Sequence, residues 1–363
     1  NSIKNHVLLM SDFFGIKNAS ILIEDSGALL PTLSARFELA VKRLFPEMEK
    51  EFLPNVSEVK KQKTTKDHLR RSRLYLPGNE PKFFPNAGLH KPDAIILDLE
   101  DSVALTEKDA AQLLVRNTLR ATDFYGCERM VRINQLPQGL ADLKYVIPHG
   151  VHVVLIPKCE GAEQIKLIEN EVNRLKAEHN IKEEVFFMPI IESAKGVLNS
   201  FEIATASNNN CSLAIGLEDY TADIGTQRTN EGTESFFARS MVVNAAKAAG
   251  IQAIDTVFSD VADMEALRDS VTQAKNLGFE GKGCIHPRQI QVIHDAFAPT
   301  KNEIEKAQKI ILAFEEAQSK GLGVISLGSK MIDAPVVKRA QNVIKLALLT
   351  NLISTNWRDE LNK

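Results

Sequence analysis

The sequence predicts an α/β protein whose main domain is a (β/α)₈ TIM barrel, followed by a helical extension and preceded by a small α+β segment. From about residue 70, short apolar runs rich in β-branched residues alternate with longer stretches of helical periodicity. Eight such units favour a closed barrel over an open doubly wound sheet. No GxGxxG or Walker A loop follows the first run, so Rossmann and P-loop folds lose their main support.

The eight predicted strands are nearly continuous in apolar character, which is typical of parallel strands buried on both faces. They are Leu74–Leu76, Ala94–Leu99, Met130–Ile133, His152–Pro157, Phe186–Ile191, Ser212–Gly216, Ala253–Val257 and Gly283–Ile285. The predicted helices between and after them include Glu107–Arg120, Glu163–Ala177, Glu234–Ala249, Met264–Leu277, 301–319 and 335–351.

The chain divides into parts of different composition. The first part contains a helical stretch, an apolar run at Ala19–Glu24 that predicts a strand, and a helix around Leu33–Phe45. A stretch dominated by Glu, Lys, Gln and Thr follows it and predicts a linker. The expected parts are residues 1–46, the linker at 47–69, the barrel at 70–300 and the helical extension at 301–363.

Composition excludes several classes of protein. The 363 residues are 44% hydrophobic and 25% charged, which is ordinary for a globular protein, and the net charge of −3 argues against nucleic acid as a partner. The four cysteines are far apart and form no CxxC pair, so neither a disulfide framework nor a zinc site is indicated. No run of ~20 apolar residues and no signal peptide are present, so we expect a cytoplasmic protein without a membrane partner. The sequence begins at Asn1 rather than Met, which leaves room for residues upstream.

Ionisable residues follow several predicted strands at the end where barrel enzymes carry their reactive groups. They lie in Asp98–Asp101, Arg132–Asn134, Pro157–Lys158, Glu192–Ser193 and Glu218–Tyr220. Carboxylates dominate, and a few hard oxygen ligands with substrate and water completing the shell are what Mg²⁺ prefers. We interpret Glu192 and Asp219 as metal ligands; ion pairs with Arg132 or Lys158 are the alternative. An arginine beside such a metal suits a developing enolate oxyanion.

Eight segments, in order, resemble the citrate lyase β-subunit and malyl-CoA lyase group of the HpcH/HpaI aldolase superfamily. They are Arg71–Gly78, Leu97–Val103, Val131–Asn134, Ile156–Lys158, Ile191–Ser193, Gly216–Tyr220, Ile285–Gln289 and Lys330–Pro335. Any one of them is weak evidence, but eight in order over residues 70–350 are specific. The segments Glu231–Glu234 and Phe237–Arg239, with the stretch Gly321–Asp333, are more similar to citrate lyase β-subunits than to short CoA-dependent relatives.

The resemblance implies roles for the charged residues. It implies Mg²⁺ or Mn²⁺ as cofactor with Glu192 and Asp219 as ligands, and Arg132 as the group that stabilises a thioester enolate. It also implies that Asp333 is a catalytic acid/base donated across a subunit interface, as in a homotrimer or hexamer. A helix N-cap before Pro335 is the alternative role for Asp333.

Other residues are assigned to the surroundings of the metal and the substrate. Glu100 and Asp101 match acids around the metal and its waters. Pro77 and Gly78 are expected to contact the substrate, and the loop of His286 is expected near the nucleotide end of a CoA-like thioester, although a plain turn residue is the alternative for His286. Lys158 is expected either to contact the substrate or to form an ion pair, and the sequence favours neither role.

The expected activity is Mg²⁺-dependent cleavage of a 3-hydroxyacyl thioester, citryl-ACP or citryl-CoA, to an acetyl thioester and oxaloacetate. Alternatives are a malyl-, methylmalyl- or citramalyl-CoA lyase giving glyoxylate or pyruvate, a class II pyruvate aldolase, and a non-catalytic scaffold. Residues 23–40 resemble the C-terminal half of the citrate lyase acyl carrier subunit, with a generic appendage as the alternative. The thiol is therefore CoA or a phosphopantetheine arm, and acyl carrier or transferase subunits are candidate partners.

Overall fold

The computed structural model describes residues 2–56, 63–319, 321, 325–327 and 330–361. The chain forms two compact units, Asn1–Ile293 and His294–Lys363, which are described one at a time below. Residues 57–62 of the predicted linker, and much of the stretch between Gly321 and Lys330, lie outside the described residues. None of the described helices combines the length and the apolar character needed to cross a bilayer.

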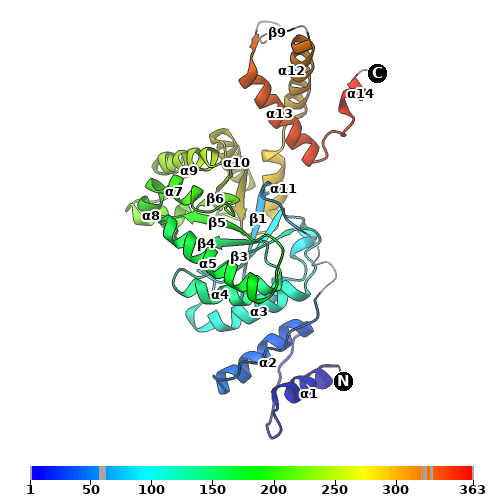
Figure 1. Ribbon diagram of the computed structural model, residues 1–363, viewed down its shortest axis with the longest axis vertical. Coiled ribbons are helices and arrows are strands. Elements are labelled where there is room, and N and C mark those ends of the chain that lie inside the picture. The colour runs from blue at the N-terminus through cyan, green and yellow to red at the C-terminus, as the bar shows by residue number, and fades with distance from the viewer. Residues whose placement is uncertain (1, 57–62, 320, 322–324, 328–329, 362–363) are drawn as a thin grey trace. The chain divides into compact units, whose positions relative to one another are not determined.

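Eight parallel strands close into a barrel in chain order, and β1 pairs with both β2 and β8. Helices surround the strands, as Figure 1 shows. The strands are β1 Ser72–Pro77, β2 Ala94–Asp98, β3 Glu128–Arg132, β4 Val153–Ile156, β5 Phe186–Ile191, β6 Ser212–Ile215, β7 Gln252–Asp255 and β8 Gly281–Cys284. The predicted (β/α)₈ fold is confirmed. Apolar side chains such as Ile96, Leu155 and Met188 form the buried core of the barrel.

The barrel helices begin and end largely where the periodicity predicts. They are α3 Lys108–Ala121, α4 Gln138–Val146, α5 Ala162–Glu178, α6 Ala194–Leu198, α7 Ser200–Thr205, α8 Leu217–Asp223, α9 Phe236–Ala248, α10 Met264–Leu277 and α11 Arg288–Phe297. Short 3₁₀ turns lie at Pro81–Phe83, Ala87–His90, Leu105–Glu107, Ile147–His149 and Thr233–Ser235. Local signals fix the ends: Asp263 caps α10 by accepting the Ala266 N–H at 2.9 Å, and Gly278 ends it with φ 106°.

The N-terminal segment is helical and irregular rather than α+β. Helices α1 Ser2–Phe14 and α2 Leu30–Leu44 pack through apolar side chains that include Met10, Phe14 and Phe37. The predicted strand at Ala19–Glu24 is wrong: no strand forms there, and Leu22 is 88% exposed. An apolar run forms a stable strand only beside a partner that takes up its backbone hydrogen bonds, and the described part of this segment contains no other strand.

A buried ion pair joins the N-terminal segment to the outside of the barrel. Arg116 of α3 donates from Nη1 and Nη2 to the two carboxylate oxygens of Glu38 in α2, at 2.9 and 2.8 Å. Both side chains are completely buried. Arg116 Nη1 also reaches Glu51 at 2.9 Å. Two acidic groups thus neutralise one guanidinium beneath α2.

The second unit is built from two long helices and a small hairpin. Its elements are α12 Lys301–Ser319, β9 Ile325–Leu327, β10 Lys330–Ile332, α13 Ala334–Leu349 and α14 Trp357–Leu361, with β9 and β10 antiparallel. The two predicted helices of the extension are confirmed. Their facing sides form a core with members such as Ile311, Phe314, Ile344 and Trp357.

Candidate active site

The charged residues that follow the strands meet at the C-terminal end of the barrel, where they surround a cavity of about 340 Å³. Asp98, Asp101, Arg132, Glu192 and Asp219 all line this cavity. Asp98 and Arg132 end β2 and β3, Asp101 and Glu192 follow β2 and β5, and Asp219 lies in the first turn of α8, after β6. The cavity volume is in the range of small-molecule sites in proteins. The sequence-predicted convergence of these side chains is therefore present in the structure.

Arg132 is held in a fixed position by two acids. Its Nε and Nη2 donate to the two carboxylate oxygens of Asp98, each at 2.7 Å, and its Nη1 lies 3.0 Å from Glu100 Oε2. Its guanidinium also lies over the ring of Tyr75, 5.3 Å from the centroid. Burial alone would lower the pKa of Arg132, but the hydrogen bonds and the charge of Asp98 outweigh burial and raise it. Arg132 is therefore a permanent, preorganised positive charge.

Asp98, which sequence analysis noted only as a strand-end residue, is a central anchor of the site. Besides binding Arg132, its carboxylate accepts the backbone N–H groups of Glu100 and Ser102, at 3.0 and 3.3 Å. Gln135 was also missed, and its side-chain amide donates to Glu100 Oε1 at 3.0 Å. The only sequence signal for Asp98 was a carboxylate ending an otherwise apolar strand.

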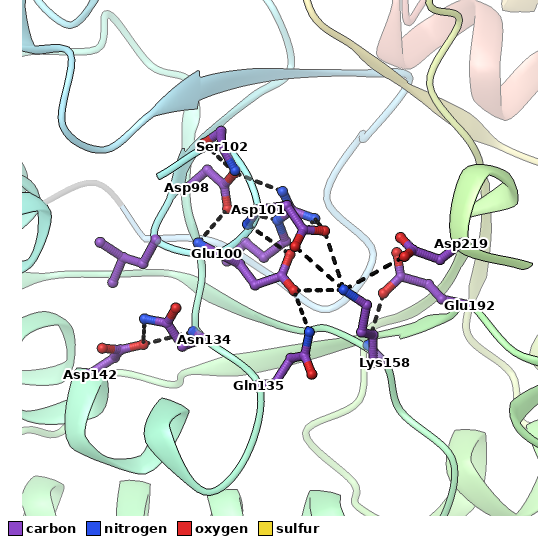
Figure 2. A network of polar contacts seen from close by, with 12 residues as sticks. Asp98, Glu100, Asp101, Ser102, Asn134, Gln135, Asp142, Lys158, Glu192 and Asp219 are labelled. Atoms are coloured by element: carbon purple, nitrogen blue, oxygen red, sulfur yellow. Dashed lines mark hydrogen bonds and ion pairs between the residues drawn. The ribbon is translucent and has the colours of Figure 1, made fainter. Parts of the chain in front are cut away.

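Lys158 links most of the acids of the site. Its Nζ lies 3.0 Å from Glu100 Oε1, 3.3 Å from Asp101 Oδ2 and 3.7 Å from Asp219 Oδ1, as Figure 2 shows. Burial opposes its charged form, but the hydrogen bond and charge of Glu100 prevail and raise the pKa of Lys158. Its backbone has φ 47°, a left-handed conformation that is costly for a residue with a side chain and often marks functional sites. Lys158 therefore makes the ion pairs that were one of its two expected roles; contact with substrate stays a prediction.

Glu192 is buried, with 6% of its surface exposed, and accepts the Lys158 N–H at 2.8 Å. Burial raises the pKa of Glu192 to about 7, even though the Lys158 N–H and the Arg132 charge both act to lower it. Its carboxylate occupies the space beside Gly216, where a Cβ atom would lie 2.3 Å from Glu192 Oε1. The glycine at position 216 is required by this close approach, not by backbone conformation.

Glu100 and Asp101 lie next to each other, but their pKa values are shifted in opposite directions. Burial acts to raise the pKa of Glu100, yet Arg132 and the hydrogen bonds around it lower it to about 2. Burial and the neighbouring Glu100 raise the pKa of Asp101. Glu100 is thus the firmly ionised member of the pair.

The donor set fits a hard divalent cation. Five carboxylates (Asp98, Glu100, Asp101, Glu192 and Asp219) face two cations, Arg132 and Lys158, so the site carries excess negative charge. Within the described residues, no three His, Cys, Asp or Glu side chains form a complete metal site by themselves. Glu192 and Asp219 could therefore supply only part of a coordination shell, which suits an ion such as Mg²⁺ that keeps waters and substrate oxygens as ligands.

The remaining predicted residues lie in different surroundings. Pro77 lines the cavity, whereas Gly78 packs on β2: its N–H donates to the Asp98 carbonyl at 2.8 Å, and a Cβ atom there would lie 2.5 Å from that oxygen. His286 follows β8, next to the cavity-lining Ile285, and its Nδ1 accepts the Arg288 N–H at 3.1 Å. These contacts do not test a role in substrate binding for Gly78 or His286.

Asp333 lies in the second unit, directly before α13. Its carboxylate accepts the Val336 N–H at 3.2 Å, which is the geometry of a helix N-cap. The N-cap role is confirmed, and the catalytic role stays a prediction.

A larger cavity, of about 620 Å³, adjoins the first one and shares Leu217, Glu218, Asp255 and Thr256 with it. The buried carboxylate of Asp255 forms ion pairs with Arg239 at 3.0 Å and Lys282 at 2.8 Å. These three charges are therefore engaged with one another, and the smaller cavity, which the predicted metal ligands Glu192 and Asp219 line, is the better candidate for catalysis.

Comparisons with known proteins agree with this geometry. The model of the HpcH/HpaI aldolase/citrate lyase family matches residues 71–287. The citrate lyase subunit beta of Leuconostoc mesenteroides is 41% identical over 80% of this chain and 97% of its own length. The mitochondrial citramalyl-CoA lyase of Mus musculus is 34% identical over 77% of this chain and 86% of its own length.

A solved structure shares the fold. The protein CitE of Mycobacterium tuberculosis, crystallised with magnesium, acetoacetate and coenzyme A, is 28% identical, with a TM-score of 0.64 over 78% of this chain and 99% of its own. The resemblance inferred from eight sequence segments is confirmed, together with the lyase assignment. The chain belongs to the HpcH/HpaI aldolase/citrate lyase family.

Proposed function

We propose that this chain is a Mg²⁺-dependent lyase that cleaves a citryl thioester to an acetyl thioester and oxaloacetate. The observation that carries the proposal is the position of Arg132, which Asp98 and Glu100 hold charged at the cavity that Glu192 and Asp219 also line. The name of the 41% identical relative and the ligands of the CitE crystal support the substrate and the cofactor.

The chemistry is a retro-Claisen cleavage. A base removes the proton of the substrate hydroxyl, the C–O bond becomes a carbonyl, and the electrons of the broken carbon–carbon bond move onto the thioester as an enolate. Arg132 stabilises the enolate oxygen, because a fixed positive charge in a desolvated site acts where negative charge develops. An acid then protonates the enolate carbon to give the acetyl thioester. A divalent ion held by Glu192 and Asp219 would supply Lewis-acid polarisation of the oxygen that becomes the keto group, with Glu100 and Asp101 binding its waters.

We assign the protonation step to Asp333, acting from a neighbouring subunit of a homotrimer or hexamer. Asn caps a helix about as well as Asp, so Asp333→Asn keeps the α13 cap while it removes the proton-transfer group. We expect Asp333→Asn to lose most of its turnover at an unchanged Tm. If the site is shared between subunits, mixed oligomers of Asp333→Asn and Arg132→Ala subunits recover part of the activity, because some sites then contain neither substitution. No recovery in demonstrably mixed oligomers would exclude action across the interface.

The thioester arm is assigned to the part of the barrel around Pro77, Gly78 and His286, with Lys158 near the acyl group. Pro77 lines the cavity and Ile285 beside His286 does so too, which supports this path. Whether the arm belongs to CoA or to a carrier is decided by substrate comparison. Residues 1–46, which resemble part of an acyl carrier, support a carrier-bound thiol and association with acyl carrier or transferase subunits.

The decisive experiment is a substrate panel. Purified protein is incubated with citryl, citramalyl and malyl thioesters of CoA and of pantetheine, with Mg²⁺, with Mn²⁺ or with EDTA, and the oxaloacetate, pyruvate or glyoxylate released is measured. We expect metal-dependent release of oxaloacetate. Preferential release of pyruvate or glyoxylate favours a citramalyl-CoA or malyl-CoA lyase, and failure to bind any of the CoA or pantetheine thioesters favours a class II aldolase. No turnover and no Mg²⁺ binding at millimolar concentration indicate a scaffold.

A further inference from the structure

Arg73 is a buried arginine without a matching acid. It lies in β1, its side chain is 2% exposed, and its Nε has no hydrogen-bond partner. Its other nitrogens contact only weak or neutral acceptors: Nη1 lies 2.9 Å from Met188 Sδ, and Nη2 lies 3.4 Å from the backbone oxygen of Asp255. Among the residues that the structure describes, no carboxylate lies within ion-pairing distance of Arg73. The carboxylate of Asp255, whose backbone oxygen Arg73 contacts, instead forms ion pairs with Arg239 and Lys282.

Of the other arginines buried in this unit, Arg129 also lacks an acid partner among the described residues, but its Nε donates to the Gly150 carbonyl and its Nη2 contacts His152, so Arg73 differs in having a nitrogen without any partner. Arg70 pairs with Glu128 and Arg116 with Glu38, each through two hydrogen bonds. An unpaired charge in an apolar interior costs folding free energy, and burial lowers the pKa of Arg73 accordingly. An apolar side chain at position 73, like those at the neighbouring core positions, would make the folded barrel more stable than Arg73 does.

The side chain of Arg73 reaches the cavity of the candidate active site. Arg73, Tyr75 and Pro77 alternate along β1 and all line that cavity, so they face the barrel interior. Arg132 lies over the ring of Tyr75. The cavity therefore has one guanidinium, Arg132, that is paired with acids and another, Arg73, two residues before Tyr75 in β1, whose Nε has no partner.

We propose that Arg73 binds the free carboxylate of the substrate's carboxymethyl arm and thereby selects a citryl thioester over citramalyl and malyl thioesters. The inference rests on the proposed function. A citryl group differs from a citramalyl group by a CH₂–COO⁻ arm in place of a methyl group, and from a malyl group by the same arm in place of hydrogen. All three substrates share a hydroxyl, an adjoining carboxylate and a thioester. The proposed function assigns the binding of these shared groups to the residues around Glu192, Asp219 and Arg132. Only the carboxymethyl arm is left without an assigned partner in the site. Its carboxylate is complementary to a buried guanidinium whose donors are not all used.

This arrangement also explains rejection of the smaller substrates. A buried polar group that is built to bind part of a substrate stays unpaired when that part is missing, and such sites discriminate strongly against the shorter analogue. The unpaired state of Arg73 is then the state of the protein before the substrate binds.

The test is the ratio of kcat/KM for citryl and citramalyl thioesters in Arg73→Met. Methionine retains length and apolar bulk while removing the charge. We expect this ratio to fall roughly 100-fold or more, through loss of citryl cleavage, while Tm stays equal or rises because an unpaired buried charge has been removed. For Arg73→Lys, which keeps a cation, we expect a citryl-to-citramalyl ratio between that of the wild type and that of Arg73→Met. Arg129→Met is the matched control: Arg129 is also buried, but it binds the Gly150 carbonyl and His152, so its loss should leave the ratio unchanged.

A binding measurement keeps the test independent of turnover. Titration calorimetry with oxaloacetate and with pyruvate is expected to show that the wild type prefers oxaloacetate at least roughly tenfold and that Arg73→Met loses this preference. An unchanged citryl-to-citramalyl ratio, or an equal loss with both substrates, would overturn the inference. If the wild type cleaves no thioester at all, the proposed function fails, and the oxaloacetate preference still decides the role of Arg73.

Discussion

Networks of ion pairs occur at both ends of the barrel, and the two groups differ in burial and in how their charges are matched. At the N-terminal end, Arg70 binds Glu128 through two hydrogen bonds of 2.7 Å, and both side chains are completely buried. At the C-terminal end, Arg132 is shared by Asp98 and Glu100, and Lys158 by Glu100, Asp101 and Asp219. The Arg70–Glu128 group is balanced, because one buried acid matches one buried base. The group around Arg132 and Lys158 is unbalanced, because acids outnumber bases around a cavity. A balanced pair stabilises the fold, whereas an unbalanced group is prepared for a ligand.

The largest effect is expected from breaking the balanced pair. Arg70→Met leaves Glu128 as a buried charge without its main partner, which costs about 3–5 kcal/mol of unfolding free energy. Urea denaturation measures this loss. The double variant Arg70→Met/Glu128→Leu is expected to recover most of it, since removing both charges leaves none unpaired. A single variant as stable as the double variant would show that Arg70 and Glu128 are not coupled.

Arg132→Ala tests the unbalanced group. Losing one preorganised partner of an oxyanion typically lowers the rate ~10²–10³-fold, so we expect kcat for thioester cleavage to fall by this amount while the circular dichroism spectrum of the folded protein is retained. Arg132→Lys serves as the control that keeps the charge but not the two-point contact with Asp98. Near-normal turnover in Arg132→Ala would rule out the enolate role.

The pH dependence of metal binding tests Glu192. A metal ligand must be deprotonated, and burial raises the pKa of Glu192 to about 7, above the ordinary glutamate value. Mg²⁺ affinity is therefore expected to be constant above about pH 7 and to fall about tenfold per pH unit below it, with proton uptake on release of the ion. In the metal-free protein the same shift makes folding stability decline as pH rises from about 4.5 through 7. Calorimetric titration at several pH values measures the affinity; in Glu192→Gln the pH dependence should disappear and binding should weaken.

The smallest effect on stability and activity is expected from removing a balanced set of ion pairs at the protein surface. Arg174 on α5 pairs with Glu171 and Glu178, each at 2.7 Å, but Arg174 and Glu178 are exposed and Glu171 is only half-buried. Exposed ion pairs contribute little, so Arg174→Ala should leave both Tm and kcat unchanged within error. A clear fall in either quantity would mean that geometry alone, without burial, makes an ion pair important in this protein.

The sequence predicts those features that depend on local pattern. The eight strands follow from apolar runs that must be buried, and the meeting of Arg132, Glu192 and Asp219 follows because parallel strands bring their C-terminal ends to one side of the barrel. The Ala19–Glu24 run has the same local pattern as the barrel strands but no partner strand, and pairing cannot be read from the run itself.

Features that depend on pairing in three dimensions escaped the sequence analysis. Asp98 and Arg132 are separated by 34 positions, and only the β2–β3 register places them side by side. Arg73 lies within the segment Arg71–Gly78, but nothing in the sequence indicates that this arginine is buried without an acid partner, because the nearby Asp255 pairs with Arg239 and Lys282 only in the folded chain. The left-handed backbone of Lys158 has no sequence signal, since glycine is the residue that usually adopts it.

The Glu38–Arg116 contact has a consequence for the modularity of the chain. A segment of two helices that precedes a closed barrel would ordinarily be expected to be removable without loss of barrel stability. Here removal of residues 1–46 exposes part of the outer surface of α3 and takes Glu38 from the buried guanidinium of Arg116, which leaves Glu51 of the linker as its acid partner. A shortened barrel would need a compensating replacement at position 116. The appendage formed by residues 1–46 therefore contributes to the stability of the barrel itself.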